Sequence, residues 1–352
     1  MERSRFVKKF VRNKAAMAGL VGLCVAFFLA VFAYLIIPDN STHANRQILP
    51  IANQAPGFSA YLKIDTLGKK KSENFFRFLL NGHTLTQNYR AYYLLRSDTC
   101  PNLLVAYDAQ NAADSLCANN FDKVLPYKQT FYLGTDPYGR DILSRLVLGI
   151  RVSLRVGLVA VLVSLLIGVA LGSLAGYFGG WLDAFIMWWL NVFWSMPLLL
   201  WVFALIMALG KREIFIFVAI GLVMWVEVAR IVRGEFLYYK QATFVEAAKA
   251  FGFSDFRIIF KHILPNLVGP LTVIAAANFA NAILLEAGLS FLGIGIQPPT
   301  PSWGNLLAEY YPYLGGKLSY LALVPAFAIL LLTLAFNFLG SGLRDVFDVR
   351  NG

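Results

Sequence analysis

The stretch Thr243–Pro265, TFVEAAKAFGFSDFRIIFKHILP, lies between two apolar runs that are each long enough to cross a bilayer. Thr243 and Glu246 have the S/T-x-x-E spacing of a capping box, in which each side chain accepts a backbone N–H of the first helical turn. Gly252 lies at the position where a residue in the left-handed conformation, with positive φ, would end the helix, and glycine adopts this conformation at little steric cost. The pattern therefore predicts a short helix with an alanine-rich face that ends at this glycine.

A second short helix is expected directly after the glycine. Ser254 is a favourable N-cap residue, and Pro265 would end the helix because it lacks a backbone N–H and its ring blocks the preceding turn. One side of this helix would carry three isoleucines: Ile258, Ile259 and Ile263. The two helices would form a rigid bracket, residues 243–265, between two membrane spans.

The composition indicates an integral membrane protein, because 58% of the 352 residues are hydrophobic. A spanning helix needs about 20 largely apolar residues. Six runs meet this requirement: residues 15–37, 154–176, 184–209, 214–231, 267–289 and 321–339. Pro197 interrupts the third of them. The sequence thus predicts an all-α integral membrane protein with six transmembrane helices.

Basic residues set the expected orientation. Residues 1–14 are rich in Lys and Arg, which favours a cytoplasmic N-terminus and an uncleaved first span over a signal peptide. Six crossings then place both termini, and the loop 234–266 with the bracket, in the cytoplasm. The net charge of +11 is spread along the chain without a nucleic-acid-binding motif, so anionic lipid is the better explanation for it.

The polar region 38–152 is expected to be a compact extracytoplasmic insertion, because no run within it is long enough to cross the membrane. From Ile142 to Ser153 it has the pattern of an amphipathic helix lying along the outer interface. Cys100 and Cys117 also fall in this insertion. They are a candidate disulfide in an oxidising compartment, and two free thiols otherwise.

Gly168, Gly172 and Gly176 recur at every fourth residue of the second span. This spacing places all three on one side of the helix, where they form a flat strip that another helix can approach closely. Local bending is the alternative use of glycine, but three glycines in register favour packing.

Six polar residues in the spans are candidates for a pore or gate: Glu227, Arg230, Asn278, Asn281, Glu286 and Asn337. A lipid-exposed glutamate at mid-depth costs about 2.5–3.5 kcal/mol, so Glu227 must face protein or water. Arg230 is one helical turn away, and a structural ion pair is favoured over a gate. The asparagines could equally hydrogen-bond between helices. Glu286 is expected near an outer mouth of the pathway.

The bracket also resembles the EAA signature of binding-protein-dependent ABC import permeases, through residues 246–248, Gly252 and residues 263–265. His262 replaces the isoleucine of the general signature, but a His-Ile/Val-Leu-Pro-Asn run is ordinary in the oligopeptide, dipeptide and nickel branch. Further motifs similar to that branch are residues 134–136 (GTD) with 139–141 (GRD), 144–145 (SR), 176–180 (GYFGG), 297–299 (QPP) with 302–304 (SWG), and 342–345 (GLRD). The resemblance covers the first span and roughly residues 131–348.

This resemblance implies a type I ABC importer permease fold in the cell inner membrane, with an enlarged extracytoplasmic loop between helices 1 and 2 and a permease core over residues 153–352. The implied partners are a second, similar permease, two cytoplasmic ABC ATPases and an extracytoplasmic peptide-binding protein. ATP and magnesium would bind the ATPases, and this chain would hydrolyse nothing. The residues implied in coupling are Glu246, Ala247, Ala248, Gly252, His262, Leu264 and Pro265.

In this interpretation the helix from Glu246 to Gly252 fits a groove on an ATPase, small alanines allow close approach, and Glu246 caps the helix. The expected cargo is a peptide, with nickel or another metal chelate as an alternative. An ATP-independent channel or secondary transporter is a second alternative, although the sequence has no convincing internal repeat of the kind many such transporters contain. A membrane scaffold is a third.

Overall fold

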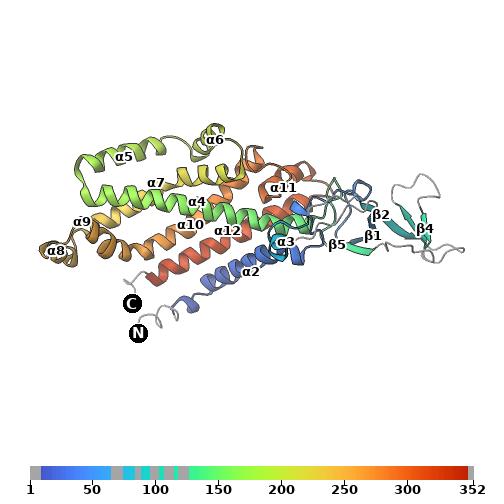
Figure 1. The fold of residues 1–352 in the computed structure, drawn as a ribbon, viewed down its shortest axis with the longest axis horizontal. Coiled ribbons are helices and arrows are strands. Elements are labelled where there is room, and N and C mark those ends of the chain that lie inside the picture. The colour runs from blue at the N-terminus through green and yellow to red at the C-terminus, as the bar shows by residue number, and fades with distance from the viewer. Residues whose placement is uncertain are drawn as a thin grey trace.

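The computed structural model describes residues 9–64, 74–83, 89–95, 103–106, 115–117 and 127–347. Its long helices run side by side (Figure 1). Five helices contain segments long and apolar enough to cross a membrane: α2 (Lys14–Ile36), α4 (Ile142–Phe178), α7 (Glu213–Tyr239), α10 (Val268–Phe291) and α12 (Tyr320–Phe347). The pair α5 (Gly180–Trp194) and α6 (Leu198–Leu209) makes a sixth candidate span, bent by 93° at the predicted interruption. The predicted α-helical membrane fold is confirmed.

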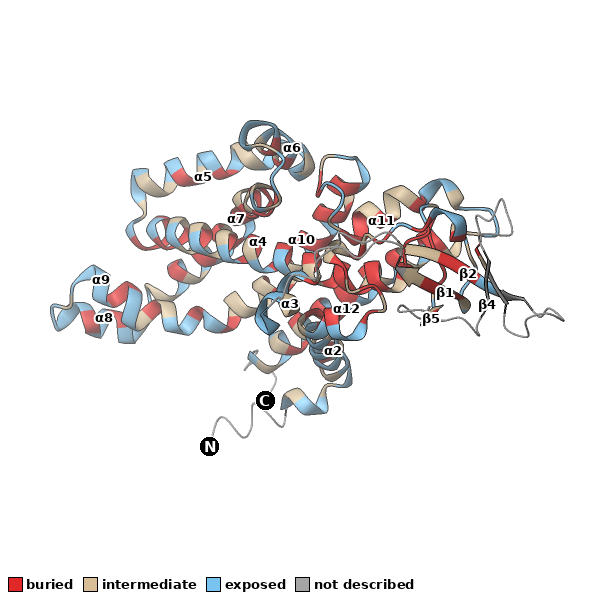
Figure 2. Ribbon diagram, turned by 45° about the vertical axis from the view of Figure 1, so that its right-hand side comes forward, coloured by how far each residue is buried: buried red, intermediate tan, exposed pale blue. Residues whose placement is uncertain are grey.

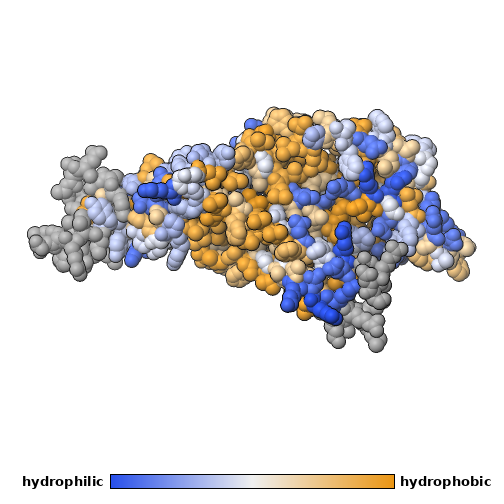
Figure 3. Space-filling view, turned by 180° about the vertical axis from the view of Figure 1, so that it is seen from behind, coloured by the Kyte–Doolittle hydropathy of each residue, from blue (hydrophilic) through white to orange (hydrophobic). Residues whose placement is uncertain are grey.

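The two ends of the bundle carry different structures (Figure 1). At one end lies α8 (Thr243–Ala250), and the start of α2 and the end of α12 point toward it. At the other end lie a sheet, α3 (Phe75–Asn81) and α11 (Trp303–Tyr310), with short 3₁₀ turns at residues 42–44, 49–51 and 311–313. Apolar side chains cover much of the surface between the two ends (Figure 3), as contact with acyl chains requires.

The insertion contains a five-stranded antiparallel sheet in the order β4-β3-β2-β1-β5. Its strands are β1 (Phe58–Ile64), β2 (Tyr89–Leu95), β3 (Leu103–Ala106), β4 (Ser115–Cys117) and β5 (Tyr127–Phe131). Ile51, Leu62 and Phe131 belong to its buried core. The pattern of this region predicts a compact insertion but does not reveal the sheet, because strands of three to seven residues contain few alternating positions to recognise.

Gly168, Gly172 and Gly176 face α7, so the predicted packing strip is confirmed. A Cβ atom on Gly172 would lie 2.5 Å from the carbonyl oxygen of Ala229, and one on Gly168 would lie 2.4 Å from the Cβ atom of Val228. Any side chain at these positions would overlap α7, so the two helices can approach this closely only with glycine. The contact between α4 and α7 is the most extensive of the helix pairs, and α10 packs against both of them, while α12 packs against α10 and α2 (Figure 2).

Residues 142–153 do not form the separate interfacial helix that was expected. They are the first turns of α4, which Asp141 caps through a 3.0 Å hydrogen bond from the Ser144 amide. At about 1.5 Å per residue, the 37 residues of α4 extend roughly 55 Å, whereas the hydrocarbon core is about 30 Å thick. The apolar side of these turns is buried in the bundle, with Ile142 and Ile150 in its main hydrophobic cluster.

A buried polar cluster joins the start of α4 to α11. Asp136 accepts hydrogen bonds from Arg140 Nε at 2.6 Å, from Arg145 Nη1 at 2.9 Å and from the Tyr310 hydroxyl at 3.1 Å. Arg145 also pairs with Glu309 at 3.0 Å. Buried charges need partners of this kind, which explains why the GTD and GRD motifs contain both signs of charge.

Candidate functional site

The first arm of the bracket is α8, whose N-terminus differs from the predicted one. Ala242, not Thr243, occupies the N-cap position, and the Glu246 amide donates to the Ala242 carbonyl oxygen at 3.1 Å. No side chain caps this end of the helix. The expected capping box is therefore wrong, because the helix begins one residue too early for Thr243 to serve as its cap.

The corner of the bracket is Gly252, as predicted, with φ at +73°. Two backbone hydrogen bonds close the end of α8: the Phe253 amide donates to the Ala248 carbonyl at 3.1 Å, and the Gly252 amide donates to the Lys249 carbonyl at 2.9 Å. This is the Schellman arrangement, which needs a left-handed residue at this position. Nothing lies within 4 Å of where a Cβ atom on Gly252 would be, so the requirement for glycine is conformational and not steric.

The second arm continues into α10, so the expected end at Pro265 is wrong. Ser254 precedes α9 (Asp255–Arg257) but makes no side-chain capping bond. A π-helical segment (Ile258–Ile263) and a 3₁₀ segment (Leu264–Leu267) follow, and the whole run from Asp255 to Phe291 forms one candidate membrane span. The changes in hydrogen-bond spacing allow the chain to pass through the proline without leaving the helix.

The bracket is attached to the bundle on one side. Val245 and Ala248 are buried in a hydrophobic cluster shared with α4, α7 and the second arm. The Tyr177 hydroxyl at the end of α4 donates to Asp255 at 2.6 Å. Ala247 is exposed, so of the two alanines only this one lies on the free surface. The bracket therefore packs against α4, α7 and α10 together.

The remaining predicted coupling residues lie along the second arm. The His262 ring stacks on Phe253, with centroids 5.7 Å apart and planes inclined by 19°. Leu264 packs partly buried against the cluster beneath the bracket. Pro265 is exposed. His262 and Leu264 therefore stabilise the shape of the arm through their contacts, while Pro265 lies on its free surface.

Four phenylalanines on the bracket have exposed side chains and are here called the coupling patch: Phe244, Phe251, Phe256 and Phe260. Phe251 is 79% exposed and Phe256 is 73% exposed. Phe256 stacks on Phe260 with ring centroids 5.8 Å apart. These residues were not predicted, although the i, i+4 spacing of Phe256 and Phe260 was a usable signal. An exposed aromatic group of this size is typical of a protein-binding surface.

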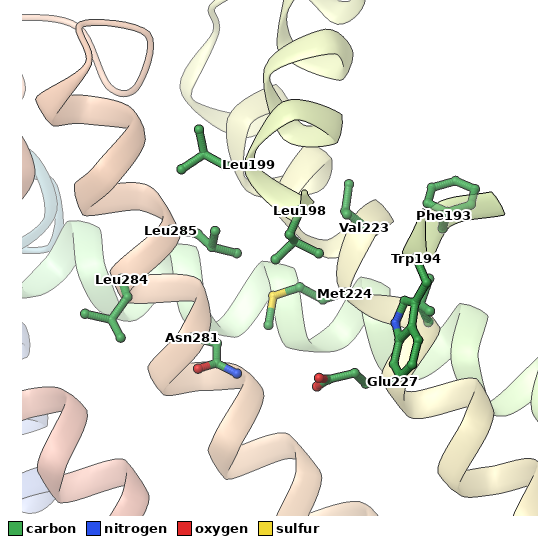
Figure 4. Close-up of a pocket in the computed structure, with 11 residues that line it drawn as sticks. Phe193, Trp194, Leu198, Leu199, Val223, Met224, Glu227, Asn281, Leu284 and Leu285 are labelled. Carbon is green, nitrogen blue, oxygen red and sulfur yellow. The ribbon is translucent and has the colours of Figure 1, made fainter. Parts of the chain in front are cut away.

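A pocket of about 320 Å³ lies beside the bend between α5 and α6, with α7 and α10 as its other walls (Figure 4). The walls are largely apolar and include Leu198, Met224 and Leu285. Glu227 from α7 and Asn281 from α10 point into it (Figure 4). The structure thus brings two of the six predicted pore residues into one cavity.

Arg230 does not pair with Glu227. Its guanidinium lies 3.4 Å from the centroid of the Trp194 ring, a cation–π contact at the end of α5. Within the described ranges, no salt bridge to Glu227 is formed. The favoured interpretation as a structural ion pair is therefore wrong, because the aromatic ring draws the arginine away and leaves the carboxylate facing the pocket.

The other three candidates lie apart from this pocket. Asn278 is fully buried, and neither polar atom of its side chain has a partner among the described residues. Glu286 is only 1% exposed and accepts a 2.6 Å hydrogen bond from Ser290, so it braces the turn after α10 and does not line an outer mouth. Asn337 is exposed on α12.

The candidate disulfide stays a prediction. Cys100 lies outside the described residues, and only the backbone of Cys117, at the end of β4, is described. Cys24, on α2, is a free and exposed cysteine.

Two protein-family models match this chain. The binding-protein-dependent transport system inner membrane component matches residues 168–351, more than half of the 352 residues. The N-terminal TM domain of oligopeptide transport permease C matches residues 3–56. The two matches together include the first span, the bracket and the pocket.

Curated relatives align with this chain over most of their length. The glutathione transport system permease protein GsiD of Salmonella paratyphi A is 42% identical over 247 residues, which cover 70% of this chain and 80% of the relative. The oligopeptide transport system permease protein OppC of Salmonella typhimurium is 44% identical over 220 residues, which cover 62% of this chain and 72% of the relative. A chain of the inward-facing MetNI methionine ABC transporter aligns with a TM-score of 0.47 and 20% identity, over 58% of this chain and 96% of that one.

Proposed function

This chain belongs to the family of binding-protein-dependent transport system inner membrane components, and from that premise we propose that it is one of two permease subunits of an ATP-driven importer of small peptides. Two relatives are named for glutathione and for oligopeptides, and both of these cargoes are peptides. In the proposed assembly a second, similar permease completes the pore. The end of the bundle that carries α8 lies on the cytoplasmic side of the membrane, together with both termini. The end that carries the sheet lies on the other side, where it faces a peptide-binding protein.

The coupling patch is the single observation that carries the mechanism. Its exposed phenylalanines lie at the end of the bundle, on a bracket fixed to α4, α7 and α10 from behind. An aromatic surface in water is stabilised when a partner covers it. We propose that a cytoplasmic ATPase binds this patch, and that closure of the ATPase dimer on ATP moves the bracket and with it the three helices. ATP and magnesium would remain on the ATPase.

The double substitution Phe251→Ser and Phe256→Ser should abolish association with the ATPase. Burying an aromatic side chain contributes roughly 1.5–3 kcal/mol, so losing two weakens binding by about 100-fold or more. The measurement is co-purification of the permease with its P-loop ATPase in mild detergent. Leu49→Ser with Tyr132→Ser, two equally exposed positions near the sheet, is the matched control. Undiminished co-purification of the first variant would rule out the patch as the contact surface.

We also propose that the pocket beside the α5–α6 bend lines the translocation pathway. A carboxylate and an amide project into an otherwise apolar cavity between helices that the bracket would move. Such a site gives a passing peptide a few polar contacts without holding it tightly. Residues on both sides of the 93° bend between α5 and α6 line this cavity.

Glu227→Gln should lower ATP-dependent peptide uptake about tenfold. Gln preserves the shape of the side chain, but it removes a charge whose hydrogen bonds are worth roughly 1.5–3 kcal/mol. Uptake of a labelled peptide into proteoliposomes containing the complete transporter is the measurement. Glu235→Gln, on the same helix but outside the pocket, should transport normally. Equal rates for Glu227→Gln and the unmodified protein would remove the pocket from the pathway.

A further inference from the structure

A second, larger cavity lies near the end of the bundle that carries the sheet. It measures about 1000 Å³, at the top of the range of about 300–1,000 Å³ that is typical of ligand sites. Residues from α2 and α4 form its walls, and Phe279 and Phe336 line it from α10 and α12. Phe27 and Leu158 on these walls are 66% and 54% exposed. The inner part of the cavity is therefore an apolar slot between membrane-spanning helices, open at the protein surface.

The rim of this slot is positively charged. Arg77, Arg151 and Arg155 line it together with one acidic residue, Glu213. Arg155 lies 2.9 Å from Glu213, but its side chain is 54% exposed and keeps further N–H donors free. Arg77 is exposed and forms no ion pair with an acidic residue in the described ranges. His43 also faces the cavity and adds little charge at neutral pH, because burial lowers its pKa.

Arg151 holds the rim in place. It donates hydrogen bonds to the carbonyl oxygens of Val31 at 2.9 Å, Leu79 at 2.8 Å and Leu80 at 3.0 Å, and to that of Ala30. The carbonyls of Leu79 and Leu80 belong to the last turn of α3, where no helical N–H is available to them. This one side chain therefore fixes α3 against α2 and α4, beside the mouth of the cavity.

The outer surface of α3 is strongly apolar. Phe75, Phe76 and Leu80 are 61%, 76% and 69% exposed, although they lie on a seven-residue helix beside the end of α2 (Figure 1). Aromatic residues at such a position are stabilised in the boundary between headgroups and acyl chains. The rim of the cavity therefore lies at the depth of lipid headgroups, while its slot extends toward the acyl region.

We propose that this cavity binds a glycerophospholipid with an anionic headgroup. Arg77 and Arg155 would bind the phosphate, since guanidinium groups match its geometry and charge, and one acyl chain would fill the slot between α2 and α4. Three arginines against one glutamate leave the rim net positive, which favours an anionic over a zwitterionic headgroup. A free phosphate would leave the apolar slot unfilled. The site is independent of the identity of the transported cargo.

Native mass spectrometry of the full-length protein, titrated with phosphatidylglycerol or phosphatidylcholine, tests this proposal. The unmodified protein should bind phosphatidylglycerol more tightly. Arg77→Gln with Arg155→Gln should weaken that binding about 25-fold, or roughly fivefold for each cation removed. Lys128→Gln with Lys317→Gln removes the same charge from exposed positions outside the cavity and should leave the affinity unchanged.

Two further variants separate the headgroup from the acyl chain. Arg77→Lys with Arg155→Lys keeps the charge and should retain most of the preference, which also distinguishes binding from misfolding. Leu158→Trp should fill the slot and weaken both lipids. Equal affinity of the unmodified protein for the two lipids, or an equal loss in the Lys128/Lys317 control, would overturn the proposal. Full competition by inorganic phosphate would show an anion site and not a lipid site.

Discussion

Gly252→Val should separate ATP hydrolysis from peptide uptake. At φ of +73° a β-branched residue is strained by about 1–3 kcal/mol. The chain can relieve this strain only by leaving the left-handed region, which breaks the two hydrogen bonds that close α8. The angle between the arms of the bracket would then be lost while the coupling patch itself remained. A strain of this size changes the population of correctly shaped brackets about 5- to 150-fold.

The measurement is the number of ATP molecules hydrolysed for each peptide transported by the purified complex in proteoliposomes. Gly315→Val is a matched control, because Gly315 also has a positive φ, at +91°, and also has empty space around its missing Cβ atom. It lies after α11, at the opposite end of the bundle. Both variants should lose similar stability, but only Gly252→Val should raise the ATP cost of transport. An unchanged ratio of ATP hydrolysed to peptide transported in both variants would contradict the proposal that the bracket couples the ATPase to the helices.

Features governed by length and by glycine could be predicted from the sequence. A run of about 20 apolar residues has few alternatives to a membrane span, so all six predicted segments contain helices in the structure. The glycines at 168, 172 and 176 could be assigned to packing because only a close neighbour explains three in register. Gly252 was recognisable as a corner for a similar reason, since helix ends favour residues that tolerate positive φ.

Features that depend on competing partners could not be predicted. Arg230 has the right spacing to pair with Glu227, but the ring of Trp194, 36 residues earlier, binds it instead. The capping box failed because the start of a helix can shift by one residue at little cost. Within the insertion, residues far apart in the chain pair as strands, for example Ser59 with Thr130. Local patterns contain no information about such contacts.

The packing of α4 against α7 provides the second test with a large expected effect, through one substitution made at two positions. Gly172→Ala and Gly234→Ala each replace a helical glycine by the best helix former, a change worth up to about 1 kcal/mol in favour of the helix. At Gly172 the added Cβ atom would lie 2.5 Å from the Ala229 carbonyl oxygen and 2.8 Å from Val232, whereas at Gly234 it would meet nothing within 4 Å. The two variants should therefore change stability in opposite directions.

Overpacking a rigid interface costs about 1–3 kcal/mol, which exceeds the gain in helix propensity at Gly172. Thermal unfolding of the purified protein in detergent should show a lower Tm for Gly172→Ala, by an amount of the order of 5 °C, and an equal or higher Tm for Gly234→Ala. Gly172→Leu should prevent accumulation of folded protein, while Gly234→Leu should be tolerated. Because the bracket packs against both helices and α7 forms a wall of the pocket, Gly172→Ala should also reduce transport, even though it lies outside the pocket and the coupling patch. Equal Tm values for the two alanine variants would mean that α4 and α7 can move apart at little cost, and the bracket would then have no stiff pair of helices to act on.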